Sequence, residues 1–407
     1  MPALLTVPQP RALTRFGPME PVYFDHAATT PVRPEVLEAM LPFFNASWGN
    51  PSSSHRFGRA AKAGLEMGKR EVGEALGVEP NQVIFTSGGT EADNLAVIGA
   101  AHAARRAGRS MHVVTSAIEH KAVLAAAHVV VSMGGRETIL PVDHNGQVRL
   151  DALDAALAEG PALVSVMWVN NEVGTVQPMV EIGARCRAAG VPLHSDAVQS
   201  FGKLPIALDE VGCSLLSISG HKLGAPKGIG ALIVRDRHIV DSLIHGGGQQ
   251  YGIRPGTENV AGAVALGRAA LLARQELDAH VIHVRTLRDN LAERLQVAIP
   301  DLVVHAAGVE RAPHVLSIAI PGAEAEAMLM HLDLAGVACS GGSACSTGAV
   351  EPSHVLTAMG VERGLALGTI RFSLGHESTA ADVNRAVEVL PGVVERVRRL
   401  GAALGRG

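Results

Sequence analysis

A lysine stands at the end of one compact apolar run. The run Ser214-Leu215-Leu216-Ser217-Ile218-Ser219 stops at Gly220 and is followed by His221 and Lys222. Its length and its glycine boundary predict a buried strand of a mostly parallel sheet. Open α/β sheets bind ligands beyond the carboxyl ends of their strands. Lys222 is therefore placed where an amine can react with a ligand, although a single lysine after a strand more often only solvates a loop.

A carboxylate follows a second predicted strand, at residues 191–195. Asp196 comes directly after this strand and is followed shortly by Gln199. Pyridoxal phosphate requires such a pair of groups, because its aldehyde reacts with an amine and its protonated pyridine nitrogen is held by a carboxylate. The sequence thus points to Lys222 and Asp196 as the two groups of such a site.

A glycine-rich turn supplies a third requirement, a place for the cofactor phosphate. Ser87-Gly88-Gly89-Thr90-Glu91 joins a predicted strand at residues 82–86 to a predicted helix that begins at Ala92. Free amides and the dipole at a helix N-terminus favour an anion, although such a turn can equally be an ordinary helix cap. A dinucleotide site is the competing interpretation, but no strand is followed by glycines at the dinucleotide spacing with an acidic residue after the next strand.

The elements that must position these residues alternate between strand and helix. Further strands are predicted at residues 111–115, 138–141, 162–169, 214–219 and 230–234. This alternation predicts a doubly wound α/β domain. The polar residues expected to meet at one edge of its sheet, just beyond the strand ends, are His120, Asn170, Asn171, Asp196, Gln199, Ser219, His221 and Lys222.

Composition excludes several classes of function. The chain has 407 residues, of which 47% are hydrophobic and 18% charged, as expected of a globular protein. Lysine and arginine number 35 against 39 acidic residues, and the net charge of −4 favours neither nucleic acid nor an anionic membrane as a partner. No apolar run approaches the roughly 18 residues of a membrane span. A small-molecule substrate is therefore expected.

The cysteines and histidines indicate the compartment and argue against a metal. Four cysteines are too few for a disulfide scaffold in a chain of this length, so a reducing compartment and a cytoplasmic location are expected. Among the 18 histidines no pair has zinc-site spacing, and no intrinsic metal is expected.

Two of the four cysteines lie in a long run of small residues. The run is Ala338-Cys339-Ser340-Gly341-Gly342-Ser343-Ala344-Cys345-Ser346-Thr347-Gly348. It has no regular period, which predicts a mobile loop. A thiol on such a loop, Cys345, is suited to attack on sulfur because the reaction needs access and mobility. A buried structural thiol and a disulfide between Cys339 and Cys345 stay open as alternatives.

The rest of the chain predicts a second, smaller domain. A second glycine-rich, non-helical stretch at residues 245–257 lies too far along the chain to join the first phosphate turn and is expected to serve a neighbouring subunit. Residues 261–295 have the pattern of one long amphipathic helix between domains. Residues 314–320 and 371–375 are typical of strands of an α+β domain, and Arg371 can grip a carboxylate in bidentate fashion.

Together these motifs resemble those of the cysteine desulfurases, the pyridoxal-phosphate enzymes of fold type I that supply sulfur for iron–sulfur clusters. The resemblance covers residues 23–375 in order and rests on Phe24-Asp25-His26-Ala27-Ala28-Thr29-Thr30, Ser87-Gly88-Gly89-Thr90-Glu91, Glu119-His120-Lys121, Asn170-Asn171-Glu172, Asp196-Ala197-Val198-Gln199-Ser200, Ser219-Gly220-His221-Lys222 and the Cys345 loop. That loop, followed by Glu351-Pro352-Ser353, is similar to the long-loop branch of the family. The chain departs from the family pattern at Gln250-Tyr251, where a Glu-Arg pair is common, and at Leu223-Gly224-Ala225, where an aromatic residue is frequent.

The resemblance implies a role for each matching residue. Lys222 would form the Schiff base with the cofactor, His120 would stack on the ring and move protons, and Cys345 would accept the sulfur. The cofactor-binding residues would be Gly89, Thr90, Asn171, Asp196 at the pyridinium nitrogen, Gln199 at the ring hydroxyl, Ser219, Gly220, His221, Lys222 and Thr257. Thr257 would reach the phosphate of the other subunit of a homodimer. Asn171 and Arg371 would hold the substrate carboxylate.

The implied activity is the removal of sulfur from L-cysteine, which gives L-alanine and a persulfide on Cys345 for an iron–sulfur scaffold or another sulfur-acceptor protein. A transient contact of Cys345 with an iron–sulfur centre is compatible with this role. Two alternatives stay open: a selenocysteine lyase or another small-amino-acid enzyme with this cofactor, and a non-catalytic assembly scaffold. The implied division is a large cofactor-binding domain at residues 36–274 and a small domain, made of residues 1–35 and 275–407, that carries the cysteine loop.

Overall fold

The central sheet has the mostly parallel α/β architecture that the sequence predicts. The structure, a computed structural model, describes residues 21–341 and 351–403. The strands of the central sheet are β2 (Val83–Thr86), β3 (His112–Ser116), β4 (Arg136–Leu140), β5 (Leu163–Ser165), β6 (Leu193–Asp196), β7 (Leu215–Ser219) and β8 (Gly230–Val234). Their order is β2-β8-β7-β6-β5-β3-β4. The strands from β7 to β4 pair in parallel, whereas β8 is antiparallel to both of its neighbours.

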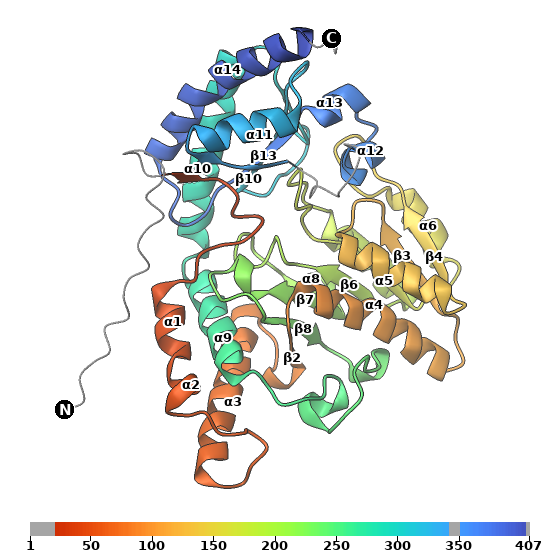
Figure 1. Cartoon of the computed structure of the whole chain (residues 1–407). Coiled ribbons are helices and arrows are strands. Elements are labelled where there is room, and N and C mark those ends of the chain that lie inside the picture. Colours follow the sequence, from red (N-terminus) through yellow and green to blue (C-terminus); the bar gives the residue numbers. More distant parts are fainter. Residues whose placement is uncertain (1–20, 342–350, 404–407) are drawn as a thin grey trace, which may run out of the picture.

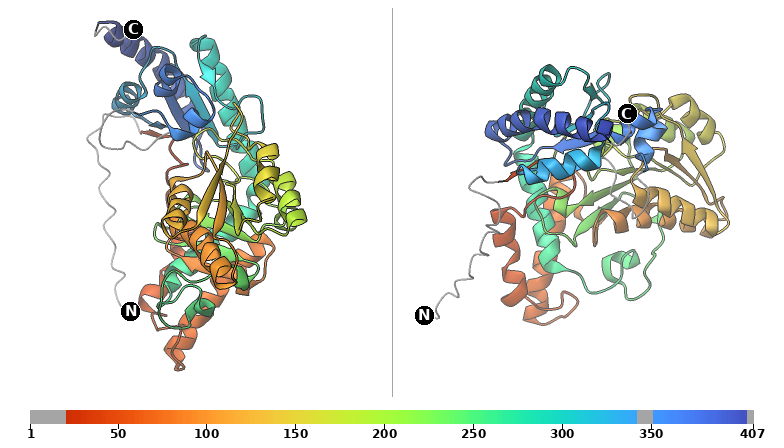
Figure 2. Two further views of the ribbon diagram at one scale, coloured as in Figure 1. Left: turned by 90° about the vertical axis from the view of Figure 1, so that its right-hand side faces the viewer. Right: turned by 45° about the horizontal axis from the view of Figure 1, so that its top comes forward.

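Helices cover both faces of this sheet (Figures 1 and 2). They are α3 (Arg56–Leu76), α4 (Gly89–Arg106), α5 (Lys121–Ser132), α6 (Leu150–Leu157), α7 (Met179–Ala189), α8 (Leu208–Val211) and α9 (Val260–Gln275), while α1 (Pro34–Met40) and α2 (Pro42–Asn45) pack on α9. In β2, β3, β5, β7 and β8, alternate residues enter different cores. Val113 packs under α4 and α5, while its neighbour Val114 belongs to the core on the opposite face. Burial on both faces explains why the strands are nearly continuous apolar runs.

A smaller lobe lies beside the central sheet, at the top of Figure 1. Its four-stranded sheet has the order β12-β13-β10-β9. The strands are β9 (Val303–Val304), β10 (Val315–Ala319), β12 (Ser340–Gly341) and β13 (Thr369–Ser373), and a parallel pair joins β1 (Val22–Tyr23) to β11 (Val337–Ala338). The helices here are α10 (Leu277–Ala298), α11 (Ala325–Leu334), α12 (His354–Ala358), α13 (Arg363–Leu367) and α14 (Ala380–Ala403). In the core of this lobe the rings of Phe24 and Phe372 pack edge to face, with their centroids 5.8 Å apart.

Two hydrophobic cores lie mainly within residues 36–274 and a third lies outside this range, whereas a fourth combines Ile118 and Met167 with Val355 and Leu356. The division at residues 36–274 stays a prediction. The core of the small lobe includes Val22 and Phe24, although the chain next forms α1 beside the central sheet. In the part of the chain that the structure describes, no helix combines the length and the apolar character that crossing a membrane requires.

The structure corrects the predicted end of one strand. The apolar run 162–169 predicts a strand of that length, but β5 ends at Ser165. The side-chain oxygen of Asn170 accepts hydrogen bonds from the amides of Glu172 and Val173, each at 2.9 Å, and so folds the following residues into a turn. The amides of Val166 and Trp168 still donate to the backbone oxygens of His194 and Asp196 in β6, at 3.1 and 3.0 Å, so the run stays paired on this one side, and the predicted regular strand was too long.

The long helix predicted at residues 261–295 is divided into α9 and α10 at Glu276. The Glu276 carboxylate accepts two hydrogen bonds from Arg33, at 2.6 and 2.9 Å, and this ion pair ties the break to the start of α1. Helical periodicity continues across the break, so the sequence pattern alone cannot locate it. The stretch 245–257, predicted to be non-helical, contains one short 3₁₀ helix, η4 (Gln249–Gly252).

Helices α3 and α9 cross so closely that only glycine fits at the contact. A Cβ atom on Gly68 would lie 2.4 Å from the backbone oxygen of Ala263. Such an approach of a Cβ to backbone forces the helices apart, because a backbone oxygen cannot turn aside as a flexible side chain can.

We expect Gly68→Ala to lower the free energy of unfolding by about 1–3 kcal/mol, the usual cost of overpacking a tight contact. Urea unfolding followed by circular dichroism measures it. Gly392→Ala in α14 is the matched control, because no atom lies within 4 Å of the added Cβ. Helix propensity should make this control neutral or more stable by up to about 1 kcal/mol. Equal midpoints for the two variants would contradict the packing argument.

Candidate active site

The predicted site residues gather around one cavity at the carboxyl ends of the central strands. The cavity has a volume of about 220 Å³. It is lined by Ala27, Gly89, Thr90, Asp93, His120, Met167, Asn171, Asp196, Val198, Gln199, Ser219, His221 and Lys222. Among these, Asp93, Ala27, Met167 and Val198 were not predicted. Gly220 lies buried between Ser219 and His221 and packs on Ile229.

Three predicted residues lie elsewhere. Arg371 does not line the cavity but reaches its border through the backbone of Asn171. Thr257 is exposed and lies away from the cavity of its own chain. Cys345 falls in residues 342–350, outside the described residues, as does a disulfide between Cys339 and Cys345.

The start of α4 forms one end of the cavity. Gly88 precedes the helix, and the hydroxyl of Thr86 donates to the Gly88 carbonyl at 2.9 Å, which holds the turn. A Cβ on Gly89 would lie 2.9 Å from a methyl group of Val198, so a larger residue would close this end. Burial lowers the pKa of the neighbouring His221 to about 4, with Lys222 adding to the effect. A neutral His221 and the free amides of α4 are donors suited to an anion.

Lys222 is held by backbone oxygen atoms at the opposite end. It belongs to a 3₁₀ turn, η2 (Gly220–Lys222), directly after β7. Its Nζ donates to the carbonyl oxygens of Ala27 and Ala28, each at 2.5 Å. Burial, with a smaller contribution from Arg371, lowers its pKa to about 8, whereas Asp25 and Asp196 oppose the shift. The amine is thus closer to its unprotonated, nucleophilic form than an ordinary lysine is.

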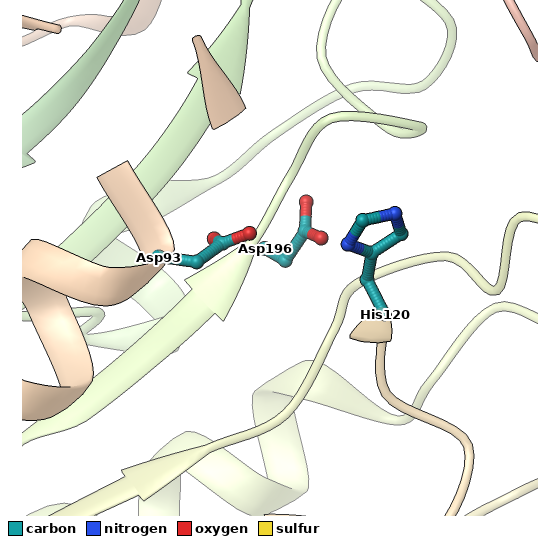
Figure 3. A group of neighbouring side chains, drawn as sticks. All are labelled: Asp93, His120 and Asp196. Carbon is teal, nitrogen blue, oxygen red and sulfur yellow. The ribbon is translucent and has the colours of Figure 1, made fainter. Parts of the chain in front are cut away.

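Two carboxyl groups and an imidazole form a row across the floor of the cavity. Figure 3 shows Asp196 between Asp93 and His120. Their ligand atoms lie within 4.8 Å of one another. Burial raises the pKa of both carboxyl groups. The cations nearby, Lys222 and Lys203, face Asp196 and favour its ionised form, so the proton of the pair resides on Asp93.

Hydrogen bonds around these carboxyl groups leave acceptors free for a cofactor. Asp196 accepts the Val198 amide at 2.8 Å through Oδ1 alone. Asp93 Oδ1 has no hydrogen-bond partner among the described residues. Behind them His194 lies between the hydroxyls of Ser165 and Ser217, at 2.8 and 2.9 Å, and burial lowers its pKa to about 3. His194 therefore adds no charge.

Arg371 is already engaged by the protein. Its Nη1 donates to the Asn171 carbonyl at 2.7 Å and its Nη2 to Asp25 at 2.8 Å. The side chain is buried, and its Nε has no partner among the described residues. A substrate carboxylate at this border would meet a guanidinium that Asp25 already orients.

Asp93 and Lys203 were not predicted from the sequence, although their spacing from predicted site residues indicates a place at the site. Asp93 follows Gly89 by one helical turn of α4, which puts both on one helix face. Lys203 follows Gln199 by four residues, and its Nζ donates to the Gln199 amide oxygen at 3.2 Å. Helical spacing from a residue already assigned to the site would have identified both.

Comparisons with known proteins agree with this geometry. Residues 22–386 match the family described as aminotransferase class-V. Cysteine desulfurase IscS of Dictyoglomus turgidum is 43% identical over 379 residues, 93% of this chain and 96% of the relative. An IscS-like cysteine desulfurase of Mycobacterium tuberculosis is 45% identical over 386 residues, 94% of this chain and 98% of the relative. A solved NifS-like protein, 34% identical, has a TM-score of 0.86 and covers 92% of this chain and 100% of its own.

The lowered pKa of Lys222 predicts its reactivity in cofactor-free protein. Below the pKa the protonated amine does not attack, and above it the neutral amine does, so acetylation of Lys222 should rise with pH around a midpoint of about 8. That midpoint is about two pH units below the one of an ordinary lysine. Peptide mass spectrometry after brief acetylation measures it. The same peptide in denatured protein is the control, and a folded-state midpoint above about 10 would contradict the assignment.

Proposed function

Because the chain belongs to the aminotransferase class-V family and is a pyridoxal-phosphate-dependent cysteine desulfurase, we propose how its own residues divide the work on L-cysteine. The observation that carries this proposal is the single cavity lined by Lys222, by Asp196 and by the start of α4.

The lining of this cavity fits the cofactor. The free carboxylate oxygen of Asp196 suits the pyridine nitrogen, and Gln199 suits the ring hydroxyl. Phosphate contacts would come from the residues at the other end, namely Gly89, Thr90, Ser219, Gly220 and His221. His120 lines the cavity and is exposed, so its ring is available to stack on the cofactor ring. When bound, pyridoxal phosphate supplies a ring that accepts the negative charge developing on the substrate Cα.

The protein side chains move the protons. Lys222 takes the Cα proton of L-cysteine, since a pKa of about 8 leaves part of the amine unprotonated near neutral pH. Asn171 and Arg371 hold the substrate carboxylate at the border of the cavity. The Cys345 thiolate attacks the substrate sulfur, and the bond from that sulfur to Cβ breaks with its electron pair remaining on carbon. His120 transfers the proton of the substrate thiol to Cβ, Lys222 returns its proton to Cα, and L-alanine leaves a persulfide on Cys345.

The flanks of the cysteine segment support this role for Cys345. Ser340, just before the segment, pairs with Arg371 in β13. Ser353, just after it, donates a hydrogen bond through its hydroxyl to the carboxylate of Glu172, the neighbour of Asn171. A segment attached at both ends to the substrate-binding border is suited to bring a thiol to the substrate.

The other cysteines are poor nucleophiles by comparison. Burial raises the pKa of Cys186, Cys213 and Cys339 to about 12, so each stays protonated near neutral pH. The thiolate is the reactive form of cysteine. This leaves Cys345 as the thiol for sulfur transfer.

The partners follow from the same assignment. A homodimer would bring Thr257, exposed and distant from the cavity of its own chain, to the phosphate in the neighbouring subunit. The persulfide would pass to an iron–sulfur scaffold or another acceptor protein in the cytoplasm.

Cys345→Ser tests the proposal most sharply. The variant should bind cofactor and still change its visible spectrum with L-cysteine, because Lys222 and Asp196 are unaltered. Alanine production should fall at least a hundredfold, since a serine hydroxyl stays protonated and is a poor nucleophile toward sulfur. Mass spectrometry of wild-type protein after L-cysteine should find one added sulfur on the Cys345 peptide.

Cys339→Ser is the matched control and should retain activity within about twofold, because a thiol with its pKa near 12 contributes little thiolate. An added sulfur on Cys339 alone, or undiminished alanine production by Cys345→Ser, would show that a different thiol accepts the sulfur.

A further inference from the structure

A second lysine is buried beside the cavity and has no assigned role. Lys203 is only 5% exposed, and among the described residues it forms no ion pair with a carboxylate. Its Nζ donates to the amide oxygen of Gln199 at 3.2 Å. Burial lowers its pKa to about 7, and Lys222 and Arg371 add to the shift. Burying an ammonium without an ionic partner costs free energy of folding. We therefore expect the position of Lys203 to serve a neighbouring group.

That group is the side-chain amide of Gln199. Gln199 Oε1 also lies 3.2 Å from Nε2 of His314, and Gln199 Nε2 donates to the Ala27 carbonyl at 2.9 Å. His314 is fully buried, and its environment lowers its pKa well below the ordinary value, so it is neutral. A neutral ring with its proton on Nε2 donates to Gln199, as Lys203 does.

These neighbours favour one orientation of the amide, chiefly because the Ala27 carbonyl can only accept. A half-turn of the Gln199 side chain would place its oxygen against the Ala27 carbonyl oxygen. The same turn would point its NH₂ group at the donors of Lys203 and His314. Both contacts would be repulsive, so the remaining N–H of Gln199 stays available for the cavity that Gln199 lines.

The same hydrogen bonds connect Lys203 with the reacting amine. The Ala27 carbonyl accepts from Gln199 and also from Nζ of Lys222, at 2.5 Å. Lys203 and Gln199 are held in place by the turn after β6. In this turn the amides of Phe201 and Leu204 donate to the backbone oxygens of Ala197 and Ser200, each at 2.9 Å, as in a helix. Residues 199 and 203 therefore share one side of the turn.

We propose that Lys203, together with His314, is a positioning residue that fixes the amide of Gln199 and, through the Ala27 carbonyl, the amine of Lys222. The inference rests on the proposed function, in which Gln199 binds the cofactor hydroxyl and Lys222 reacts. Lys203 touches neither substrate nor cofactor in this role and acts through Gln199.

A double-mutant cycle tests this dependence. Lys203→Met, Gln199→Ala and the double variant are compared as cofactor-loaded proteins, first by their visible absorption before substrate and then by kcat and KM for L-cysteine. Each single variant should shift the absorption band in the same direction, and Lys203→Met should lower kcat about tenfold, the value of one hydrogen bond from a charged donor. The double variant should resemble Gln199→Ala, because the effect of Lys203 passes through that amide.

Two further variants complete the design. Lys62→Met removes an exposed lysine on α3 and should leave both the spectrum and kcat unchanged. Lys203→Arg keeps the donors and the charge and should recover part of the lost activity. Should Lys203→Met fail to fold, His314→Leu removes the other donor to the same oxygen and enters the same cycle.

The outcomes separate this inference from the proposed function. If Gln199→Ala leaves the spectrum unchanged, the proposed role of Gln199 at the cofactor fails. A different outcome is that Gln199→Ala shifts the absorption band while Lys203→Met leaves the band in place and kcat within twofold of wild type. In that case only the role of Lys203 is overturned. Additive losses in the double variant would overturn it as well, because they would mean that Lys203 acts independently of Gln199.

Discussion

The hydrogen bond between the Lys222 ammonium and the Ala27 carbonyl depends on a short segment that both lobes hold. The Ala27 amide donates to the hydroxyl of Ser373 in the small lobe at 2.9 Å. Three residues later, the Thr30 amide donates to the carbonyl of His221 at the edge of the central sheet, also at 2.9 Å. A buried ammonium without acceptors carries a large desolvation cost. The segment therefore positions the lysine and joins the two lobes with the same few hydrogen bonds.

The chain after the cysteine segment is attached to that edge through two other turns. The hydroxyl of Ser353 donates to Glu172, and the ring of His354 bonds the Glu119 backbone oxygen at 3.0 Å. Burial raises the pKa of Glu119 to about 8 and that of Glu172 to about 7, although hydrogen bonds from serine hydroxyls oppose both shifts. These acids follow the strand ends that also present His120 and Asn171. The turns proposed to bind the substrate and the residues that follow the cysteine segment are thus joined by direct hydrogen bonds.

The sequence allowed the main site to be predicted because strand ends of a parallel sheet meet in space. Lys222 and Asp196 could be brought together by that rule alone, without any knowledge of side-chain packing. Asp93 and Lys203 each lie one helical turn beyond a recognised residue, which agrees with a place at the site, but the sequence alone does not show that they are buried there. The break at Glu276 was also missed, since the ion pair that accompanies it comes from Arg33, far away in the chain. Long-range partners of this kind leave no local pattern.

The charges around Lys222 explain why one of the two carboxyl groups in the floor must stay protonated. Arg371 lowers the pKa of Lys222, but its ion pair with Asp25 at 2.8 Å offsets part of that effect. Asp196 raises the same pKa, and a second ionised carboxylate at Asp93 would raise it further. A higher pKa would leave less of Lys222 unprotonated near neutral pH, and so less of the base proposed to take the substrate proton. Because burial keeps Asp93 neutral, the cavity retains a single carboxylate for a cationic ring nitrogen and still holds an amine that can act as a base near neutral pH.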